Sequence, residues 1–471
     1  MRCISGLLKL TTDEASFAIT LSIVEATNVI GNLQQCYGFG GPVVCVWVWV
    51  VVCFFTTFVG LSMAEIVSGL PTAGGPFFWA SWLGGKHAPL IAWITGYLNL
   101  VGIVGVTASV AFDATYGAGI VLNLLCNIEV TWPQMFGVYA GLLVLAGGVN
   151  LLPTRMLTCV TALSLFWIIV TVISMVLLLP TVAPWHRPAS FVFWTFQSWQ
   201  QSVSGITSNA YLVLQGSLLC IWTFTGYEAS AHMSEETVAA RSATPAAIIM
   251  SLGASYIIGL LLIIVLLFCV QNPDNVLTGS AQGAAGYQII LDAFVARFGD
   301  KFWGVIFILV PLLGSCMSTI ISIAVNSRMV YAFARDKGIP TYFSVEAFDG
   351  VISIETVGLQ VSYGIPILCK MTVGRKIHEP GTFTLGRYSL LCNGLAVFWV
   401  LASMVPLMTP SGFPITLSTF NFAPVALALV LAGTLSAWYL PHFGARHWFK
   451  GHRHRPYLTR LRKIRKMHLK R

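Results

Sequence analysis

The chain alternates long apolar runs with short polar breaks. A helix needs about 20 apolar residues to cross a bilayer, and backbone exposed to lipid must be helical because no water satisfies its hydrogen bonds there. Eleven runs meet this length, and each is predicted to be a membrane-spanning helix. These runs cover residues 16–36, 42–63, 90–112, 134–152, 157–179, 211–234, 246–270, 302–333, 351–368, 388–407 and 416–440.

Composition supports an integral membrane protein. Only 9% of the 471 residues are charged and 56% are hydrophobic, whereas soluble domains carry about 25% charged residues. The eleven cysteines contain no CxxC pair, so neither a metal centre nor a disulfide framework is expected. No nucleophile–base pair and no cofactor loop is found. We therefore expect no enzyme, no cofactor and no metal.

The apolar runs and the charged residues together divide the chain into three parts. Residues 1–15 form a short N-terminus, 16–440 a membrane domain, and 441–471 a tail with an excess of basic residues. If the N-terminus is cytosolic, residues 1–337, which include the N-terminus and the end of span eight, place eight Lys or Arg inside and three outside, as the positive-inside rule predicts. The tail could bind anionic lipid, and we expect no nucleic-acid partner.

Later loops contradict this orientation. With eleven crossings, the loop with Lys370 and Arg387 and the whole basic tail would lie outside. One more crossing before residue 351 would remove the conflict, but residues 338–350 are too short and too acidic to cross. That region is therefore either re-entrant, or one helix is missing.

Four carboxylates lie within or at the ends of spans, where burying a charge is costly and usually serves function. Glu65 and Asp113 stand near span boundaries, where solvation at the interface can explain them. Glu25 and Glu228 lie inside spans one and six. The stretch 224–228 combines glycine, hydroxyls and a carboxylate, which predicts a discontinuous helix; the alternative is a glycine at a tight helix crossing.

Span one has a similar polar interruption at residues 20–31, five spans before the one in span six. Secondary transporters built from two inverted five-helix repeats place their broken helices at these positions. The pattern therefore favours a transporter with its site between spans one and six.

Several ordered segments resemble the amino acid–polyamine–organocation superfamily. The likeness is greatest to its eukaryotic amino acid/choline branch of GABA-permease-like and bidirectional amino-acid transporters. It runs from about residue 16 to 440. The matching segments are 41–49, 63–66, 71–79, 93–99, 224–236, 326–336, 338–340, 362–366 and 385–387.

This resemblance implies an all-α, LeuT-type inverted-repeat fold of twelve helices that works by alternating access. The first repeat would cover about 16–180, the second about 205–370, and two further helices 388–440. By this resemblance, helix nine has no counterpart between residues 340 and 351, which would leave the second repeat incomplete.

The resemblance also implies roles for particular residues. The substrate carboxylate would lie on backbone N–H groups of span one, with span six as the facing half-site and Phe224 as the lid. The implied substrate-binding residues are Ser22, Ile23, Val24, Glu25, Ala26, Phe224, Thr225, Gly226, Tyr227 and Glu228. The implied gate residues are Glu65, Pro71, Gly74 and Gly75. Hydroxyls for a sodium site would come from Ser315, Ser318 and Thr319, although ordinary helix packing also explains them.

Relatives have a small or hydroxylated residue where this chain has Glu25. A carboxylate there could receive a substrate ammonium group or carry a proton. The function expected is transport of amino acids or related amines such as GABA, a polyamine or a choline-like amine, in the plasma or vacuolar membrane. The coupling ion, H⁺ or Na⁺, is undetermined. The alternative, motivated by the missing helix, is a non-transporting truncated isoform or a membrane nutrient sensor.

Overall fold

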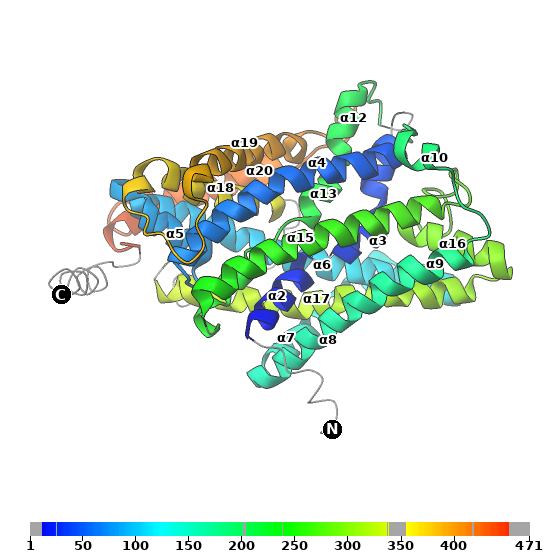
Figure 1. Ribbon diagram of the computed structural model, residues 1–471, viewed down its shortest axis with the longest axis horizontal. Helices are drawn as coiled ribbons and strands as arrows, with labels where there is room; N and C mark the ends of the chain where they lie inside the picture. Colours follow the sequence, from blue (N-terminus) through cyan, green and yellow to red (C-terminus); the bar gives the residue numbers. More distant parts are fainter. Residues whose placement is uncertain are drawn as a thin grey trace.

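The computed structural model describes residues 12–24, 26–199, 201, 204–237, 239–336, 338, 355–416 and 419–451. Within these residues all regular structure is helical, and the long helices run roughly along one axis (Figure 1). Seven continuous helical segments of the described chain are long and apolar enough to cross a membrane. The all-α polytopic prediction is therefore confirmed.

The first half of the bundle begins with a broken helix. It consists of α2 (Thr12–Val24), the 3-10 turn Ala26–Asn28, α3 (Val29–Asn32) and the start of α4 (Gln34–Gly69). Gly41 interrupts α4 with φ 71° and ψ −159°, just before Pro42, so the boundary predicted between spans one and two lies at this kink.

The remaining helices of this half follow in order. They are α5 (Gly75–Leu83), α6 (Ala88–Cys126), α7 (Trp132–Asn150) and α8 (Thr154–Ile173), which continues through a π-helical turn into α9 (Leu179–Val182). Helix α4 ends, and α6 begins, at the end of the bundle where α5 lies. We call this end of the bundle the α5 end.

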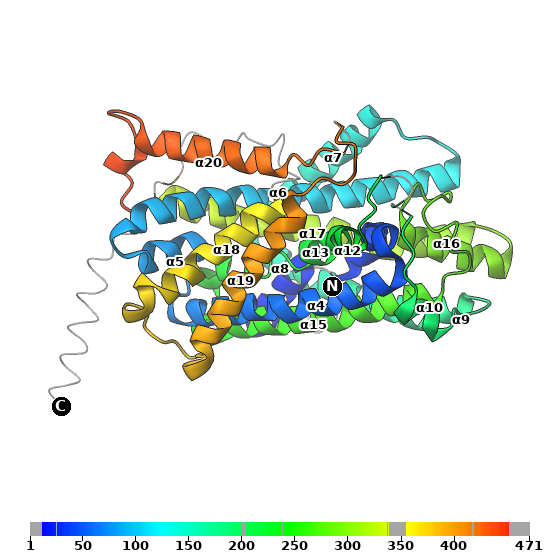
Figure 2. The same ribbon diagram turned by 90° about the horizontal axis from the view of Figure 1, so that it is seen from above.

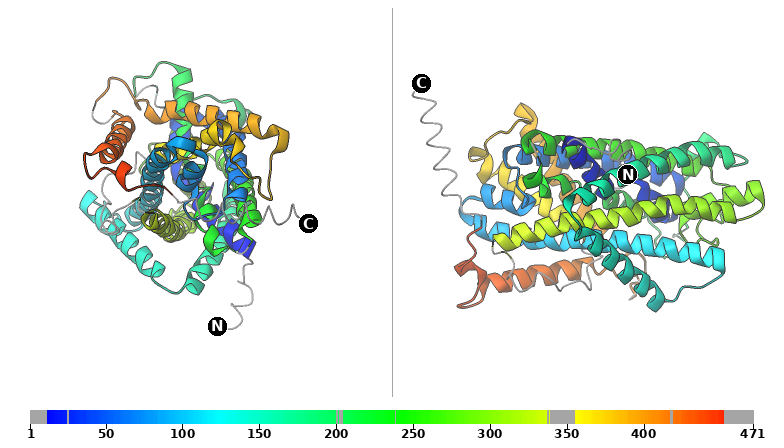
Figure 3. Two further views of the ribbon diagram at one scale, coloured as in Figure 1. Left: turned by 90° about the vertical axis from the view of Figure 1, so that its left-hand side faces the viewer. Right: turned by 90° about the horizontal axis from the view of Figure 1, so that it is seen from below.

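The second half also begins with a broken helix, which follows the short α10 (Ala189–Trp194). Its pieces are α12 (Asn209–Gly216), α13 (Leu218–Thr223) and α14 (Ala229–His232). The other helices are α15 (Ala240–Phe268), α16 (Ala285–Phe298), α17 (Phe302–Arg335), α18 (Glu355–Met371), α19 (Ser389–Met408) and α20 (Ala423–Tyr439). Viewed along the helices, α7 and α20 lie at the periphery (Figure 3).

The described residues of α18 extend from the middle of the bundle to the α5 end. Its first residue, Glu355, lies against Gly105 at the middle of α6, and Lys370 near its last residue pairs with Glu65 at the α5 end. Arg335, the last residue of α17, pairs with Glu235 at the same end. Figure 2 shows α18 and α5 together there. Residues 351–354 of the predicted span 351–368 lie outside the described residues, and its described part covers only the half of the bundle next to the α5 end.

This arrangement removes the conflict in the charges. No net crossing occurs between Arg335 and Lys370, so α19 leaves the α5 end, α20 returns to it, and Gly451 lies beside Ser81 of α5. Lys370 and Arg387 consequently lie at the same end as Arg335. The segment in which helix nine was expected, 339–354, lies outside the described residues, as does the tail from residue 452.

Candidate functional site

Both predicted helix breaks are present. Helix α13 ends at Thr223 and α14 begins at Ala229, and Gly226 between them has φ +82°, a conformation that a side chain disfavours. In span one, α2 ends at Val24 and a 3-10 turn begins at Ala26. Glu25, expected to be a substrate-binding residue, lies outside the described residues. The discontinuity in span six is thus confirmed.

The two breaks face each other in the core of the bundle. A Cβ atom added to Gly226 would lie 2.6 Å from Cγ2 of Ile23, closer than a real contact allows. The backbone angle and this contact both require glycine at position 226. The two segments expected to form the site, about 200 residues apart in sequence, are therefore in contact.

A small cavity of about 10 Å³ lies between the breaks, with room for about one water molecule. We call it the central cavity. Of the predicted site residues, Ile23, Val24 and Thr225 line it. The other lining residues are Asn28, Val106, Val110, Trp222, Thr223 and Glu355.

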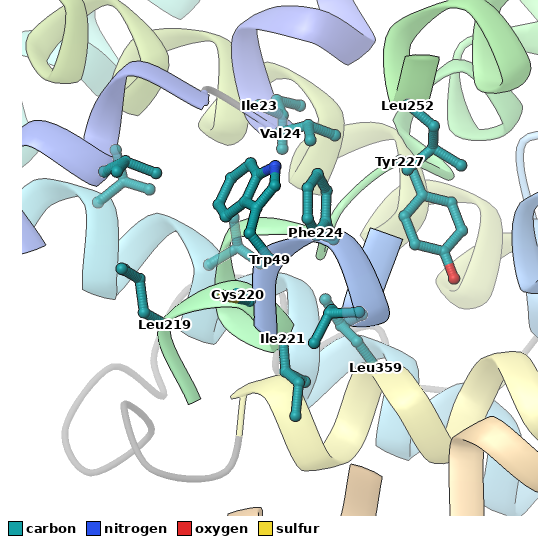
Figure 4. Close-up of a cluster of buried hydrophobic side chains, with 14 of the residues drawn as sticks. Ile23, Val24, Trp49, Leu219, Cys220, Ile221, Phe224, Tyr227, Leu252 and Leu359 are labelled. Atoms are coloured by element: carbon teal, nitrogen blue, oxygen red, sulfur yellow. The ribbon is translucent and has the colours of Figure 1, made fainter. Parts of the chain in front are cut away.

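Phe224, expected to be the lid, packs elsewhere. Its ring lies 4.6 Å from the Trp49 ring and 5.0 Å from the Tyr256 ring, centroid to centroid, and is fully buried. Figure 4 shows it beside Trp49, with Ile23 and Val24 next to them. In this conformation Trp222 is the aromatic residue that borders both the central cavity and a larger space beside it.

That larger space, called the vestibule below, has a volume of about 660 Å³ and lies toward the end of the bundle opposite α5. Asp113 is its only charged lining residue among those the structure describes. The other lining residues are Asn32, Gln34, Gln35, Ser109, Phe112, Tyr116, Leu218, Leu219, Trp222, Gln282, Gly283, Leu407, Asn421 and Ala423. Pockets that bind small ligands usually measure about 300–1,000 Å³, so the vestibule could hold one.

Glu228 points toward α18. Its carboxylate accepts a hydrogen bond from the Tyr363 hydroxyl, whose oxygen lies 3.3 Å from the donating backbone N of Gly226. The Tyr227 ring lies 5.1 Å from the Tyr363 ring, centroid to centroid. Glu228 therefore joins the break in span six to α18, and its partner could not be identified from sequence spacing.

The predicted gate residues gather at the α5 end, which is closed. Glu65 accepts hydrogen bonds from the Lys370 ammonium and, at 2.7 Å, from the Ser389 hydroxyl. Both charged side chains are 6% exposed, so the interpretation of Glu65 as a solvated interfacial group is wrong. Pro71 and Gly74 belong to the turn before α5, and Gly75 (φ +51°) packs against the His232 ring.

Further pairs seal this end. Arg335 pairs with Glu235 at 2.9 Å, and Arg328 pairs with Glu236 at 2.9 Å. Glu235 also accepts a hydrogen bond from the Ala73 backbone N at 3.2 Å. These contacts tie α17 to the segment after α14 and to the turn before α5.

The proposed sodium-site hydroxyls lie on α17 beside the first break. Ser318 donates to the Ser22 carbonyl at 2.7 Å, and the Ser22 hydroxyl accepts from Ser164 at 2.9 Å. Thr319 donates to the Ser315 carbonyl in its own helix at 2.9 Å, as ordinary helix packing predicts.

Ser315 lies beside a carboxylate. Its hydroxyl is 2.9 Å from Oδ1 of Asn28 and 3.3 Å from Oδ2 of Asp113. Asn32 donates to Oδ1 of Asp113 at 2.8 Å. Asp113 is half-buried, hydrogen-bonded and borders the vestibule.

Sequence reasoning missed Glu355. It was not counted among the intramembrane carboxylates, although it stands inside the run 351–368, and a charge in an apolar run is a signal that could have identified it. In the structure its side chain is buried and lines the central cavity.

Comparison with known proteins identifies the family. A family model described as "Amino acid permease" matches residues 14–346. This chain belongs to the amino acid permease family. Its relatives include the Amino-acid permease BAT1 of Arabidopsis thaliana, which is 34% identical over 93% of this chain and 92% of that protein. The GABA-specific permease of Saccharomyces cerevisiae is 27% identical over 87% of this permease and 77% of that protein.

A solved structure shares the fold. The manganese transporter of Eremococcus coleocola aligns with 90% of this permease and 92% of that chain, with a TM-score of 0.50 and 13% sequence identity. The family model and the curated permeases, rather than this fold, show that the chain is an integral membrane permease and not an enzyme, and they confirm the resemblance stated from its motifs.

Proposed function

We propose that this permease moves amino acids or related amines, such as GABA, a polyamine or a choline-like amine, by alternating access at its two facing helix breaks. The observation that carries the proposal is the contact between Ile23 and Gly226, which brings both breaks to one small central cavity. Freed backbone groups at such breaks can bind the charged ends of a substrate within the membrane. The vestibule on one side of the breaks and the ion-paired α5 end on the other support alternating access, since one side is open and the other is closed.

In this conformation substrate would enter from the vestibule. The central cavity holds about one water molecule, so Trp222 and the break residues must move apart before an amino acid fits. The substrate carboxylate would then lie on the N–H groups of residues 22–26, opposite residues 224–228. Release at the α5 end would require separation of the pairs that close it, including Lys370 with Glu65.

A coupling cation would bind near Ser315 and Ser318, since both hydroxyls face the first break. Whether it is H⁺ or Na⁺ can be read from the effect of each gradient on uptake. We place the N-terminus and the α5 end in the cytosol, in the plasma or vacuolar membrane, where the basic tail could contact anionic lipid.

The test is flux through the purified protein. Proteoliposomes containing the full chain should take up labelled alanine or GABA, and the uptake should saturate and be competed by unlabelled substrate. Protein-free liposomes give the background. Binding without flux would support the alternative of a sensor or a non-transporting isoform, and absence of both would contradict the proposal.

A further inference from the structure

One carboxylate at the boundary between the vestibule and the central cavity has an oxygen that no described residue hydrogen-bonds. Glu355 is 1% exposed and lines the central cavity. Its carboxyl group interacts with Ser109 and Trp222, two residues that line the vestibule. Its Oε2 atom has no hydrogen-bond partner among the described residues. The carboxylate thus stands between the two spaces.

Burying a carboxylate with an unpaired oxygen costs free energy unless a cation or a donor compensates it. A negative charge in the first turn of α18 suits the helix dipole and partly explains a Glu at this position. The dipole does not explain why the side chain faces the two helix breaks. The free oxygen can accept a hydrogen bond from a positively charged group that enters the central cavity.

The side chains around Glu355 indicate what kind of substrate molecule could carry this positively charged group. Ile23, Val24, Val106 and Val110 make one wall of the central cavity apolar. An apolar wall suits a methylene chain. The Trp222 indole also interacts with the Glu355 carboxyl group, so an ammonium group that approaches this carboxyl would meet the indole there. A substrate with a methylene chain could therefore place its ammonium group beside Glu355 and its carboxylate group, at the other end of that chain, at the break in span one.

We propose that Glu355 is a specificity-determining residue that binds a substrate ammonium group remote from the substrate carboxylate. The preferred substrates are then dibasic or ω-amino acids. The proposal rests on the function proposed above. Approach of the ammonium group competes with the Trp222 indole for the carboxylate, which releases Trp222 from the boundary between the vestibule and the central cavity. A neutral side chain of equal length leaves the carboxylate unpaired and binds more weakly.

The test compares L-lysine with L-norleucine, which has the same carbon chain without the terminal ammonium. Equilibrium binding to the purified full chain in nanodiscs is measured by calorimetry, so the result does not depend on flux. The wild-type protein should prefer lysine. Glu355→Gln should weaken lysine binding by about thirty-fold or more, as expected for loss of one partner of a buried charge pair. It should change norleucine binding by less than about three-fold.

Two further variants make the result decisive. Glu129→Gln removes an exposed carboxylate in the loop after α6, at the vestibule end of the bundle, and should leave both affinities unchanged. Glu355→Asp keeps the charge and should retain part of the lysine preference, which also serves if the Gln variant does not fold. Equal loss of lysine and norleucine binding in Glu355→Gln, or a wild-type protein with no lysine preference, would overturn the proposal. Flux of neutral amino acids without a lysine preference would overturn this inference and leave the proposed function standing.

Discussion

The Lys370 ammonium donates a hydrogen bond to the Glu65 carboxylate inside the bundle, which joins α18 to the end of α4. Glu65 also accepts hydrogen bonds from Ser389 and from the Leu385 backbone N at 3.1 Å. One carboxylate therefore connects α4, α18, α19 and the loop between the last two. This pair therefore fixes the C-terminal end of α18 to the end of α4.

Removing one partner of this pair should destabilise the protein strongly. Lys370→Met or Glu65→Gln leaves a buried group without its partner, and we expect each to cost about 3–5 kcal/mol of unfolding free energy. The double variant should lose less than the two single losses added together. Thermal unfolding in detergent measures the effect. Glu236→Gln breaks a more exposed pair and should cost less than about 1 kcal/mol; equal losses at both pairs would refute this view of the α5 end.

Gly226 should be essential for transport. An alanine there meets both the positive φ and the Ile23 side chain, so the break must shift by several tenths of an ångström or more. We expect Gly226→Ala to lower the initial uptake rate at least about ten-fold, since small displacements at a site cost this much. Gly433→Ala is the matched control, because a Cβ at that position of α20 meets nothing within 4 Å. Uptake that is unchanged in Gly226→Ala would argue against the facing breaks as the site.

His378 should make stability depend on pH. It lies in the loop between α18 and α19, where burial, followed by the nearby Lys370 charge, lowers the pKa of its imidazole to about 4. An unfolded histidine takes up a proton near pH 6.5, so the unfolded state binds more protons between pH 6.5 and 4. The stability present above pH 6.5 is therefore lost as the pH falls through this window.

The measurement is the melting temperature at pH 7.5 and pH 5. His378→Gln should reduce the difference between the two temperatures. His87→Gln, which changes an exposed histidine before α6, should not. A pH dependence identical in all three proteins would show that His378 does not contribute.

Both termini should lie on the same side of the membrane. Helix α20 ends at the α5 end, where Gly451 contacts Ser81, and α2 begins on the same side of the helix breaks as α14 ends. Epitope tags placed before Met1 and after Arg471 should thus show the same accessibility in sealed membranes. Protection of one tag and exposure of the other would mean that the chain makes a further crossing between α17 and α18.

The sequence by itself determined the membrane class, the family and the two helix breaks. These properties depend on local patterns: the length of an apolar run, the lack of charge, and a glycine beside hydroxyls in mid-span. The bilayer enforces such rules on each segment separately, because every span must satisfy its own backbone. The same reasoning placed the start of span two at Pro42, directly after the kink at Gly41.

Tertiary structure decided which side chains meet. Lys370 and Glu65 are 305 residues apart, and Tyr363 and Glu228 are 135 apart, so no spacing rule connects them. The direction of Phe224 toward Trp49, the position of Glu355 beside the breaks and the attachment of α18 to the end of α4 also follow from packing. Side chains of a closely packed interior are placed by neighbours from distant parts of the chain, and these neighbours are defined only once the helices have assembled.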